Sequence, residues 1–342
     1  MKVVKDVNIP DSETVKLIAV KTYGLKPISE PKLLRGGTES RAWVIETKTG
    51  KWIVKLYLSY EGTITEIEEE IKLYDYLNSN SINAPSVLVS VNGNKVETLK
   101  IGKKKIPVIV MRHEDLRTAL PSTITKKEVG IIAKETAKFH ILLQSYEGVE
   151  KLSANTNTDN SSDYRGESNY KPTFPVLLDS PNSRVYTKRE LRTAKKTDTR
   201  IIEYLNGTSI NGPLTESLIH GDLALEHAPF LPNGKVYFFD WTDRGWAPVV
   251  KEIATTLVHL FREDDISIER WEILRDWFID SYCKTNPLTE IEIATIYKFV
   301  LERIWVEAKY LNELSNKLKV DYDGEGVKRR YKLGKYILDN LL

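Results

Sequence analysis

One stretch of the chain, residues 218–245, constrains its fold more than any other: LIHGDLALEHAPFLPNGKVYFFDWTDRG. Two short apolar runs within it, around 227–231 and 235–239, flank a Pro-Asn-Gly sequence at 232–234. Asn-Gly after Pro is a strong signal for a tight turn between antiparallel strands. The stretch therefore predicts a hairpin, and a hairpin brings its two open ends together.

The open ends of this predicted hairpin carry His227 and Asp240, and Asp222 lies in the loop just upstream. We expect these three side chains, each able to handle a proton or a metal, to converge on one small volume. His-Gly-Asp alone is weak evidence, because short tripeptides recur by chance. The loop, the hairpin and the Asp-Trp that ends it are together much more specific.

The N-terminal part of the chain reads as strands with two helices. Residues 11–24 begin with Asp-Ser, end with Gly and carry apolar residues at helical spacing, which predicts a short helix. Runs 42–47 and 51–57 around a Lys-Thr-Gly turn predict a hairpin, and 65–79 predict an amphipathic helix. Further strands are expected around the Asn-Gly turn at 92–93.

The rest of the chain is mostly helical in pattern. A helix with a broad apolar face is expected over 126–144, helical patterning resumes over 188–206, and a helix-rich region fills 248–342. Between them, 150–173 is polar and poor in large aliphatic residues, which predicts a long loop or insertion.

Composition excludes several classes of protein. A formal net charge of +2 is too small to indicate a nucleic-acid or membrane partner, and the single Cys283 allows no intrachain disulfide. The N-terminus lacks the apolar run of a signal peptide, and no stretch approaches a membrane span. We therefore expect a soluble, cytoplasmic protein of ordinary globular composition, and the sequence does not address its oligomeric state.

The order of these motifs resembles the aminoglycoside phosphotransferase and choline kinase superfamily, which shares the two-lobed protein-kinase-like fold. That family's pattern is HGDLxxxN, a hairpin, and an apolar run ending in Asp-Trp. Further resemblances are LLRGGTESRAWVIET to its nucleotide loop, GKWIVKLY to its lysine strand, EIKLYDYLNSNSINAPSVL to its helix-plus-Pro segment, and ETAKFHIL to its Leu-His helix. The matches span roughly residues 30–260.

The resemblance implies an α+β fold with a small β-rich N-lobe and a larger α-helical C-lobe. We expect the nucleotide-binding lobe over residues 1–110 and the catalytic and substrate-binding lobe over 111–342. The activity implied is transfer of the γ-phosphate of ATP or GTP to a hydroxyl of a small-molecule substrate. Mg²⁺ is the implied metal, with Mn²⁺ as an alternative.

The resemblance also implies roles for four charged residues. Asp222 would be the catalytic base that accepts or orients the hydroxyl proton, and Asp240 would chelate the metal that bridges the phosphates. Lys55 lies on a predicted strand and would reach the α and β phosphates. Glu70, at the edge of the apolar stripe of helix 65–79, would pair with Lys55.

Weaker signals complete the expected nucleotide site. Gly36 and Gly37 allow close approach of the backbone to phosphates, and Ser40 offers a hydroxyl. The segment between the lobes supplies Val110, Met111 and His113, whose backbone would meet the nucleotide base. Nothing in the sequence favours adenine over guanine.

His227 departs from the family pattern, which has Asn at this position. Mg²⁺ prefers oxygen ligands and binds imidazole poorly, so the change should weaken the metal site. Three accounts stay open: His at the metal, water between His and the metal, or a degraded pseudokinase. The macrolide phosphotransferases carry a similar HGDLxxxH…DW and are active, which favours the working enzyme. At 251–252, Lys-Glu replaces the family's Asp-Leu-Ala opening, a mild change because Glu252 keeps the charge.

Two alternatives to the small-molecule kinase remain. One is a non-catalytic nucleotide-binding pseudokinase or scaffold, and the other is a choline/ethanolamine-type or protein kinase. Five tryptophans in the C-terminal region are compatible with an aromatic cage for a quaternary ammonium, although core packing is the favoured explanation: Trp241, Trp246, Trp271, Trp277 and Trp305. His220 is expected to brace the loop, and His140 to be a core histidine.

Overall fold

The computed structural model describes residues 10–34, 40–58, 64–101, 104–148, 170–262 and 266–342. The chain divides into two compact units, one formed by 1–117 with 231–239 and the other by 118–230 with 240–342. The predicted lobe boundary at 110/111 lies inside a strand of the first unit. That boundary stays a prediction.

The first unit is built on a five-stranded antiparallel sheet in the order β1-β2-β3-β5-β4. Its strands are β1 (Lys32–Leu33), β2 (Arg41–Thr47), β3 (Gly50–Leu56), β4 (Glu97–Ile101) and β5 (Lys104–Arg112). The predicted Lys-Thr-Gly hairpin is confirmed, since β2 pairs with β3 in a register that sets Val44 opposite Ile53.

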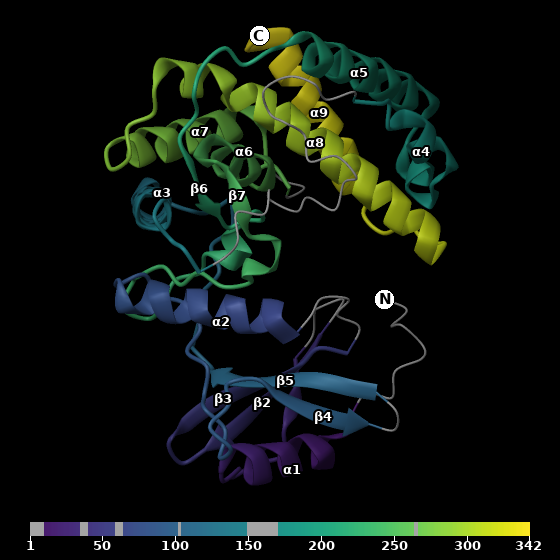
Figure 1. The fold of residues 1–342 in the computed structure, drawn as a ribbon. Helices are drawn as coiled ribbons and strands as arrows, with labels where there is room; N and C mark the ends of the chain where they lie inside the picture. The colour runs from purple at the N-terminus through teal and green to yellow at the C-terminus, as the bar shows by residue number, and fades with distance from the viewer. Residues whose placement is uncertain (1–9, 35–39, 59–63, 102–103, 149–169, 263–265) are drawn as a thin grey trace. The chain divides into compact units, whose positions relative to one another are not determined.

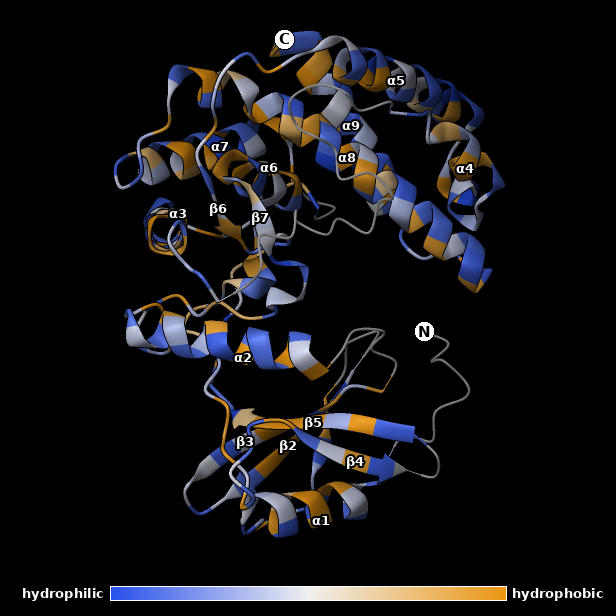
Figure 2. Cartoon of the chain, in the orientation of Figure 1, coloured by the Kyte–Doolittle hydropathy of each residue, from blue (hydrophilic) through white to orange (hydrophobic). Residues whose placement is uncertain are grey.

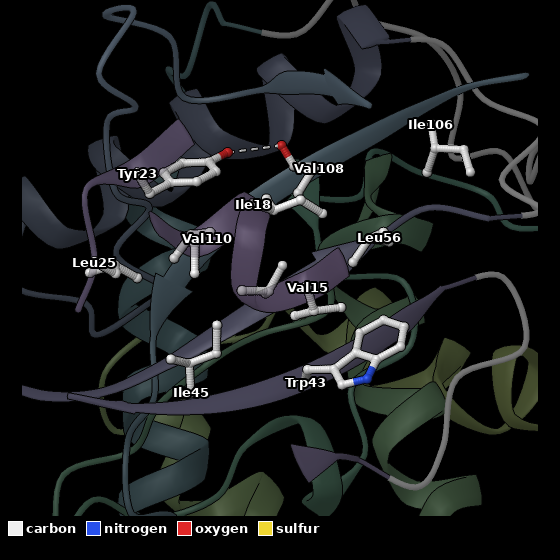
Figure 3. Packing of buried hydrophobic residues seen from close by; sticks show 12 residues of the cluster. Val15, Ile18, Tyr23, Leu25, Trp43, Ile45, Leu56, Ile106, Val108 and Val110 are labelled. Atoms are coloured by element: carbon white, nitrogen blue, oxygen red, sulfur yellow. Dashed lines mark hydrogen bonds between the residues drawn. The ribbon is translucent and has the colours of Figure 1, made fainter. Parts of the chain in front are cut away.

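Helix α1 (Ser12–Tyr23) packs on this sheet through its apolar stripe. The Asp11 side chain accepts a hydrogen bond from the Thr14 N–H at its start, and Gly24 ends it in the left-handed conformation. Figure 3 shows the resulting core and the Tyr23 hydroxyl, which donates to the Val108 carbonyl over 3.1 Å. Helix α2 (Ile64–Ser79) lies on the other side of the sheet from α1 (Figure 1).

The predicted hairpin at 227–239 is wrong as a pair of strands. The turn forms, because the Leu231 N–H donates to the Lys235 carbonyl over 2.8 Å, but the first strand does not. Residues Leu225–His227 form a 3-10 turn instead. The second run pairs with Asn83: its side-chain amide donates to the Val236 carbonyl and its carbonyl accepts from the Phe238 N–H.

The second unit is mainly helical, as the patterning predicted. Its α-helices are α3 (Lys126–Leu143), α4 (Phe174–Asp179), α5 (Lys188–Gly207), α6 (Val249–His259), α7 (Ile268–Cys283), α8 (Glu290–Leu318) and α9 (Gly324–Asn340). A short 3-10 helix, η1 (Pro181–Val185), follows α4. Helix α6 packs on α8, α3 packs on α7, and α8 packs on α9 and α5 (Figure 1).

Three of these helices begin with a capping box, which fixes their start from local sequence. In α3, α5 and α8 a Thr side chain accepts from the backbone N–H of a Glu three residues later, and that Glu reaches back to the Thr N–H. Helix α5 is mostly hydrophilic with narrow hydrophobic bands (Figure 2). In the described part of the chain, no helix is long and apolar enough to cross a membrane.

A two-stranded antiparallel ribbon in the second unit brings together the segments that carry the candidate site residues. Strand β6 (Glu216–Ile219) pairs with β7 (Gly245–Pro248), with Ile219 opposite Gly245. The chain leaves β6 and enters β7 at the same end of the ribbon, so the segments 220–223 and 240–244 lie side by side. Most of the predicted polar loop, 150–173, lies outside the described residues.

Candidate active site

The loop His220–Leu223 continues from β6 and is shaped by Gly221. The backbone of Gly221 has a φ of +86°, a conformation that side chains rarely adopt. A Cβ at this position would lie 2.0 Å from the carbonyl oxygen of Asp243. Glycine is therefore required here for two independent reasons, and the close approach keeps the loop against the segment that leads into β7.

Glu252 holds the same loop from the first turn of α6. Its fully buried carboxylate accepts hydrogen bonds from the backbone N–H groups of His220, Gly221 and Leu223. Burial raises the pKa of Glu252 to about 7, against these three donors, which favour the ionised form. The departure noted at 251–252 thus preserves a carboxylate that fixes the backbone of the loop.

Asp222 projects from this loop into a cluster of basic groups. Its Oδ1 lies 2.9 Å from Nε2 of His259 and 2.6 Å from Nη2 of Arg303, which both reach the same oxygen. Oδ2 accepts no hydrogen bond from any residue that the structure describes; Nδ1 of His227 lies 3.7 Å away. One oxygen of the carboxylate is therefore bound by protein donors and the other is not.

The electrostatics of this cluster keep Asp222 ionised. Burial opposes ionisation, but the hydrogen bond from His259 and the positive charge of Arg303 outweigh it and hold the pKa of Asp222 well below its usual range. An ionised carboxylate can accept a hydrogen bond from a hydroxyl group. It suits phosphoryl transfer, in which the hydroxyl needs orientation more than early deprotonation.

Arg303 is itself fixed by a chain of ion pairs across α8 and α9. Its Nε donates to Glu307, one helical turn further along α8, and Glu307 also accepts from Arg330 of α9. Burial opposes the charge of Glu307, and the two guanidinium groups hold its pKa well below the usual range. Arg330 also lies 3.4 Å from Asp323.

Sequence reasoning missed His259, Arg303, Glu307 and Arg330. His259 lies at the end of α6. Because histidine handles protons and the chain has only five, its residue type alone was a signal for the site. The spacing of Arg303 and Glu307 also indicates a helical ion pair. Nothing local connects either of them to residue 222.

His227 lies beside Asp222, as predicted, but contacts its backbone. Nδ1 of His227 is 2.6 Å from the Asp222 carbonyl oxygen, and a carbonyl only accepts, so Nδ1 carries the proton. Nε2 faces Asp240, whose Oδ2 is 3.9 Å away. The neighbouring Glu226 points elsewhere and pairs with Arg262.

Asp240 sits at a strained point of the backbone. Its φ of 66° and ψ of 58° are left-handed, a region that few residues other than Gly adopt and that is enriched at functional sites. Its side chain is half exposed, and its Oδ1 accepts from the Thr242 hydroxyl over 2.9 Å. The bend turns the carboxylate toward His227.

The side chains at this end of the ribbon fit Mg²⁺ only in part. In the part of the chain that the structure describes, no three His, Cys, Asp or Glu side chains form a ready-made metal cluster. Mg²⁺ is usually held by one or two carboxylates together with substrate phosphates, so Asp240 fits that chemistry. The imidazole of His227 is within reach of a shared ion but is the poorer ligand.

Two further histidines have the structural roles that the sequence predicted. His220 is buried with its ring centroid 4.7 Å from that of the fully buried Trp241, and its Nδ1 accepts from the Asp222 N–H over 3.4 Å, so it braces the loop. His140 is fully buried, and its Nδ1 lies 2.7 Å from the Tyr282 hydroxyl. Burial lowers the pKa of His140 to about 3.

In the first unit, Lys55 and Glu70 occupy the elements expected of them. Lys55 lies on β3 with its Nζ 4.8 Å from the centre of the Tyr57 ring. Glu70 is buried on α2 and accepts from the Tyr74 hydroxyl, whereas Glu68 is exposed. No ion pair between Lys55 and Glu70 is found among the residues described. Their pairing in the nucleotide-bound protein stays a prediction.

The weaker nucleotide signals are only partly visible. Gly36 and Gly37 lie outside the described residues, and the Ser40 carbonyl accepts from Arg41. In the predicted base-binding segment, the Val110 carbonyl accepts from Leu88.

The rest of that segment also bonds within the first unit. Met111 pairs with Ile53, and the His113 N–H donates to the Lys51 carbonyl over 3.1 Å. Contact between this segment and a nucleotide base stays a prediction.

Three of the five tryptophans are core residues. Trp241, Trp271 and Trp305 are buried in the core. The indole N–H of Trp271 donates to the Leu257 carbonyl, and that of Trp305 to the Lys171 carbonyl. Core packing, the favoured explanation, accounts for these three.

Solved structures of several kinases share this fold over nearly the whole chain. An amicoumacin kinase in complex with AMP-PNP and Ca²⁺ aligns with a TM-score of 0.67 at 17% identity, covering 96% of this chain and 94% of that one. A microcompartment-associated aminopropanol kinase gives 0.68 at 16%, covering 96% and 98%. A choline kinase from Cryptosporidium parvum gives 0.58 at 15%, covering 96% and 97%. No curated protein sequence matches significantly.

These alignments show a kinase-like α+β fold, as the sequence predicted. The sequence itself adds the family. Residues 30–288, well over half of the chain, match the model of the phosphotransferase enzyme family. The matched region contains the ribbon, the loop with Asp222, and Asp240. The chain belongs to the phosphotransferase enzyme family.

Proposed function

We propose that this protein transfers the γ-phosphoryl group of ATP or GTP to a hydroxyl group of a small molecule, with Asp222 as the catalytic carboxylate. The observation that carries the proposal is the asymmetry of Asp222. Its Oδ1 is bound by Arg303 and His259, while Oδ2 accepts no hydrogen bond from the residues described. An ionised carboxylate with one oxygen available is suited to orienting a hydroxyl.

The reaction balances simply. The hydroxyl oxygen of the acceptor attacks the γ-phosphorus, and a new P–O bond forms as the bond to the β–γ bridging oxygen breaks. The nucleoside diphosphate leaves with the electrons of that bond, and the hydroxyl proton passes to Oδ2 of Asp222. Positioning and neutralisation of charge supply most of the catalysis in such reactions.

Other residues would bind the donor. Asp240, with His227 beside it, would hold Mg²⁺ or Mn²⁺, which neutralises phosphate charge when it is bound. Lys55, steadied by Glu70, would contact the phosphates. The segment containing Val110, Met111 and His113 would contact the base, and the loop with Gly36, Gly37 and Ser40 would cover the phosphates.

The kinases whose folds resemble that of this chain support a small-molecule acceptor. By name, one is an amicoumacin kinase, one an aminopropanol kinase and one a choline kinase. A fourth is a spectinomycin phosphotransferase solved with ADP and spectinomycin. The chain from Asp240 to the start of α6 at Val249 is also short. It leaves little room for the long activation segment of a protein kinase.

One observation favours a second candidate, a non-catalytic nucleotide-binding protein. The imidazole of His227 occupies the place of an oxygen ligand, and its Nδ1 is committed to the Asp222 carbonyl. In that case the protein would bind nucleotide but release no nucleoside diphosphate with any acceptor. Asp222→Asn would then leave the rate of nucleoside diphosphate release unchanged.

The test has two stages. Calorimetry with ATP and GTP, each with Mg²⁺ or Mn²⁺, should show saturable binding, and absence of binding with every pair would remove both candidates. Release of nucleoside diphosphate is then measured against a panel of hydroxylated antibiotics, amino alcohols, sugars and nucleosides. We expect Asp222→Asn to lower the rate with the active acceptor by about 10²- to 10⁴-fold. The surface variant Asp339→Asn is the control; equal rates for wild type and Asp222→Asn would refute the catalytic assignment.

A further inference from the structure

We infer that Arg303 and His259 are positioning residues of the phosphoryl transfer, which hold Asp222 by Oδ1 and turn Oδ2 toward the acceptor hydroxyl. This inference rests on the proposed function and goes beyond it by assigning roles to residues of α6 and α8. Neither residue needs to touch the acceptor or the nucleotide for the role to hold.

Arg303 donates two hydrogen bonds to the loop that carries Asp222 and a third to a residue of its own helix, α8. Nη2 lies 2.6 Å from Asp222 Oδ1, Nη1 donates to the Gly221 carbonyl over 3.2 Å, and Nε donates to Glu307. A planar guanidinium with three bonded nitrogens has little freedom to rotate. The side chain therefore fixes the Asp222 carboxylate and the Gly221 carbonyl relative to α8.

The far end of this linkage is anchored as well. Glu307 accepts from both Arg303 and Arg330, so the guanidinium of α8 is tied to α9 through one carboxylate. The charges alternate along the chain of residues Arg330, Glu307, Arg303 and Asp222. With two cations and two anions in sequence, each buried charge has an opposite neighbour, as buried ion pairs require.

His259 completes the restraint on Oδ1. Its Nε2 lies 2.9 Å from that oxygen, and its Nδ1 is buried without a hydrogen-bond partner among the residues described. A carboxylate oxygen accepts, so Nε2 must carry the proton. Nη2 of Arg303 lies 3.3 Å from Nε2 because both are donors that converge on one oxygen.

The consequence is a carboxylate with a single orientation. Two donors on Oδ1, approaching from α6 and α8, fix both side-chain torsions of Asp222. Oδ2 then stays directed away from both donors. A displacement of about 1 Å at a reacting group can cost about 10²-fold in rate, so such a restraint has a measurable effect.

A double-mutant cycle tests the positioning role. The probe is release of nucleoside diphosphate from MgATP, with the active acceptor of the panel and with water alone. We expect Arg303→Gln to lower kcat by about 10- to 100-fold while the KM for MgATP stays within about twofold. Arg303→Lys, which keeps the charge but not the forked geometry, should recover part of the loss.

The decisive measurement is the effect of Arg303→Gln on kcat in the Asp222→Asn variant. If Arg303 acts through Asp222, Arg303→Gln should cost less than about twofold there, because the group it positions is already lost. The same loss in both backgrounds would overturn the inference and leave Arg303 a purely structural residue. Equal rates for wild type, Arg303→Gln and His259→Gln would overturn it too.

Two controls separate positioning from misfolding. Arg200→Gln removes a guanidinium that bonds Asp339 and the Leu338 carbonyl between α5 and α9, and should leave kcat unchanged. The charge-balanced double variant Arg303→Gln/Glu307→Gln should fold even if the single variant does not, and should show the same loss of kcat.

A measurement without any acceptor distinguishes failure of the inference from failure of the proposed function. In ¹⁵N spectra of the five histidines, assigned with His259→Gln, the His259 ring should carry a proton at Nε2. Asp222→Asn should shift the Nε2 resonance. A ring protonated at Nδ1 alone, or unaffected by Asp222→Asn, would refute the inference even in an active kinase. If this signature is present but no acceptor reacts, the proposed function is what fails.

Discussion

Arg303 and Asp222 lie 81 residues apart in the sequence, and their side chains meet over 2.6 Å. The candidate catalytic carboxylate is thus built by a short loop but oriented by a helix from a distant part of the chain. Glu252 does the same for the loop backbone from α6. The loop therefore carries the carboxylate, and the helices hold both the carboxylate and the loop backbone in place.

Asp240→Ala should remove the metal-dependent part of nucleotide binding. Its carboxylate is the oxygen ligand at the end of the ribbon, so without it we expect the affinities with and without Mg²⁺ to become equal. Calorimetry with ATP in the presence of Mg²⁺ and of EDTA measures this. Asp276→Ala, an exposed site on α7, is the control and should keep the wild-type difference. A preserved Mg²⁺ effect in Asp240→Ala would contradict the assignment.

His227→Asn should retain activity and shift metal preference toward Mg²⁺ over Mn²⁺. The amide can still donate to the Asp222 carbonyl as Nδ1 does, and its oxygen suits Mg²⁺ better than imidazole. The ratio of kcat/KM values with the two metals is the measurement. An unchanged ratio would indicate that the side chain does not touch the ion, and its role would then be the hydrogen bond alone.

Gly221→Ala should destabilise the protein strongly. The left-handed backbone alone costs about 1–2 kcal/mol for a residue with a side chain, and the new Cβ would also meet the Asp243 carbonyl at 2.0 Å. Gly93 has nearly the same φ, +87°, with nothing within 4 Å, so Gly93→Ala isolates the backbone cost. Urea unfolding should show a larger loss for Gly221→Ala than for Gly93→Ala. Equal losses would mean that the loop can move away from Asp243.

His140→Gln should make stability less sensitive to acid. Burial lowers the pKa of His140 from 6.5 to about 3, so between these values the unfolded chain binds more protons than the folded one. The free energy of unfolding therefore falls as the pH falls through this window, by at most about 1.4 kcal/mol per pH unit for one proton. Urea unfolding from pH 7 to pH 4 should give a shallower decline for the variant. Parallel curves would show that His140 does not contribute to it.

Local sequence predicted the elements of this fold well. Apolar residues at helical spacing predicted α3, and alternation around Lys-Thr-Gly predicted the β2–β3 hairpin. Helical spacing alone placed Glu70 at the edge of the apolar stripe of α2, and the side chain is buried there. These features depend on a few neighbouring residues, so a single sequence is enough to specify them.

The hairpin at 227–239 was the instructive error. The Asn-Gly turn formed as predicted, but the run after it pairs with Asn83, which is far away in the sequence. The convergence expected from that hairpin is instead supplied by the β6–β7 ribbon, whose ends place the segments with Asp222 and Asp240 together. A turn signal specifies the turn, and the partner of the following run is decided by what else can pair with it.

The sequence by itself determined the loop, the two aspartates and the family, because these are carried by short motifs in a fixed order. Only the tertiary structure decided which oxygen of Asp222 is bound, since that depends on His259 and Arg303, and through Glu307 on Arg330 of α9. The physical reason is range. Helix caps and turns are satisfied within a few residues, whereas a buried charge is satisfied by whichever opposite charge the packing of distant helices brings beside it.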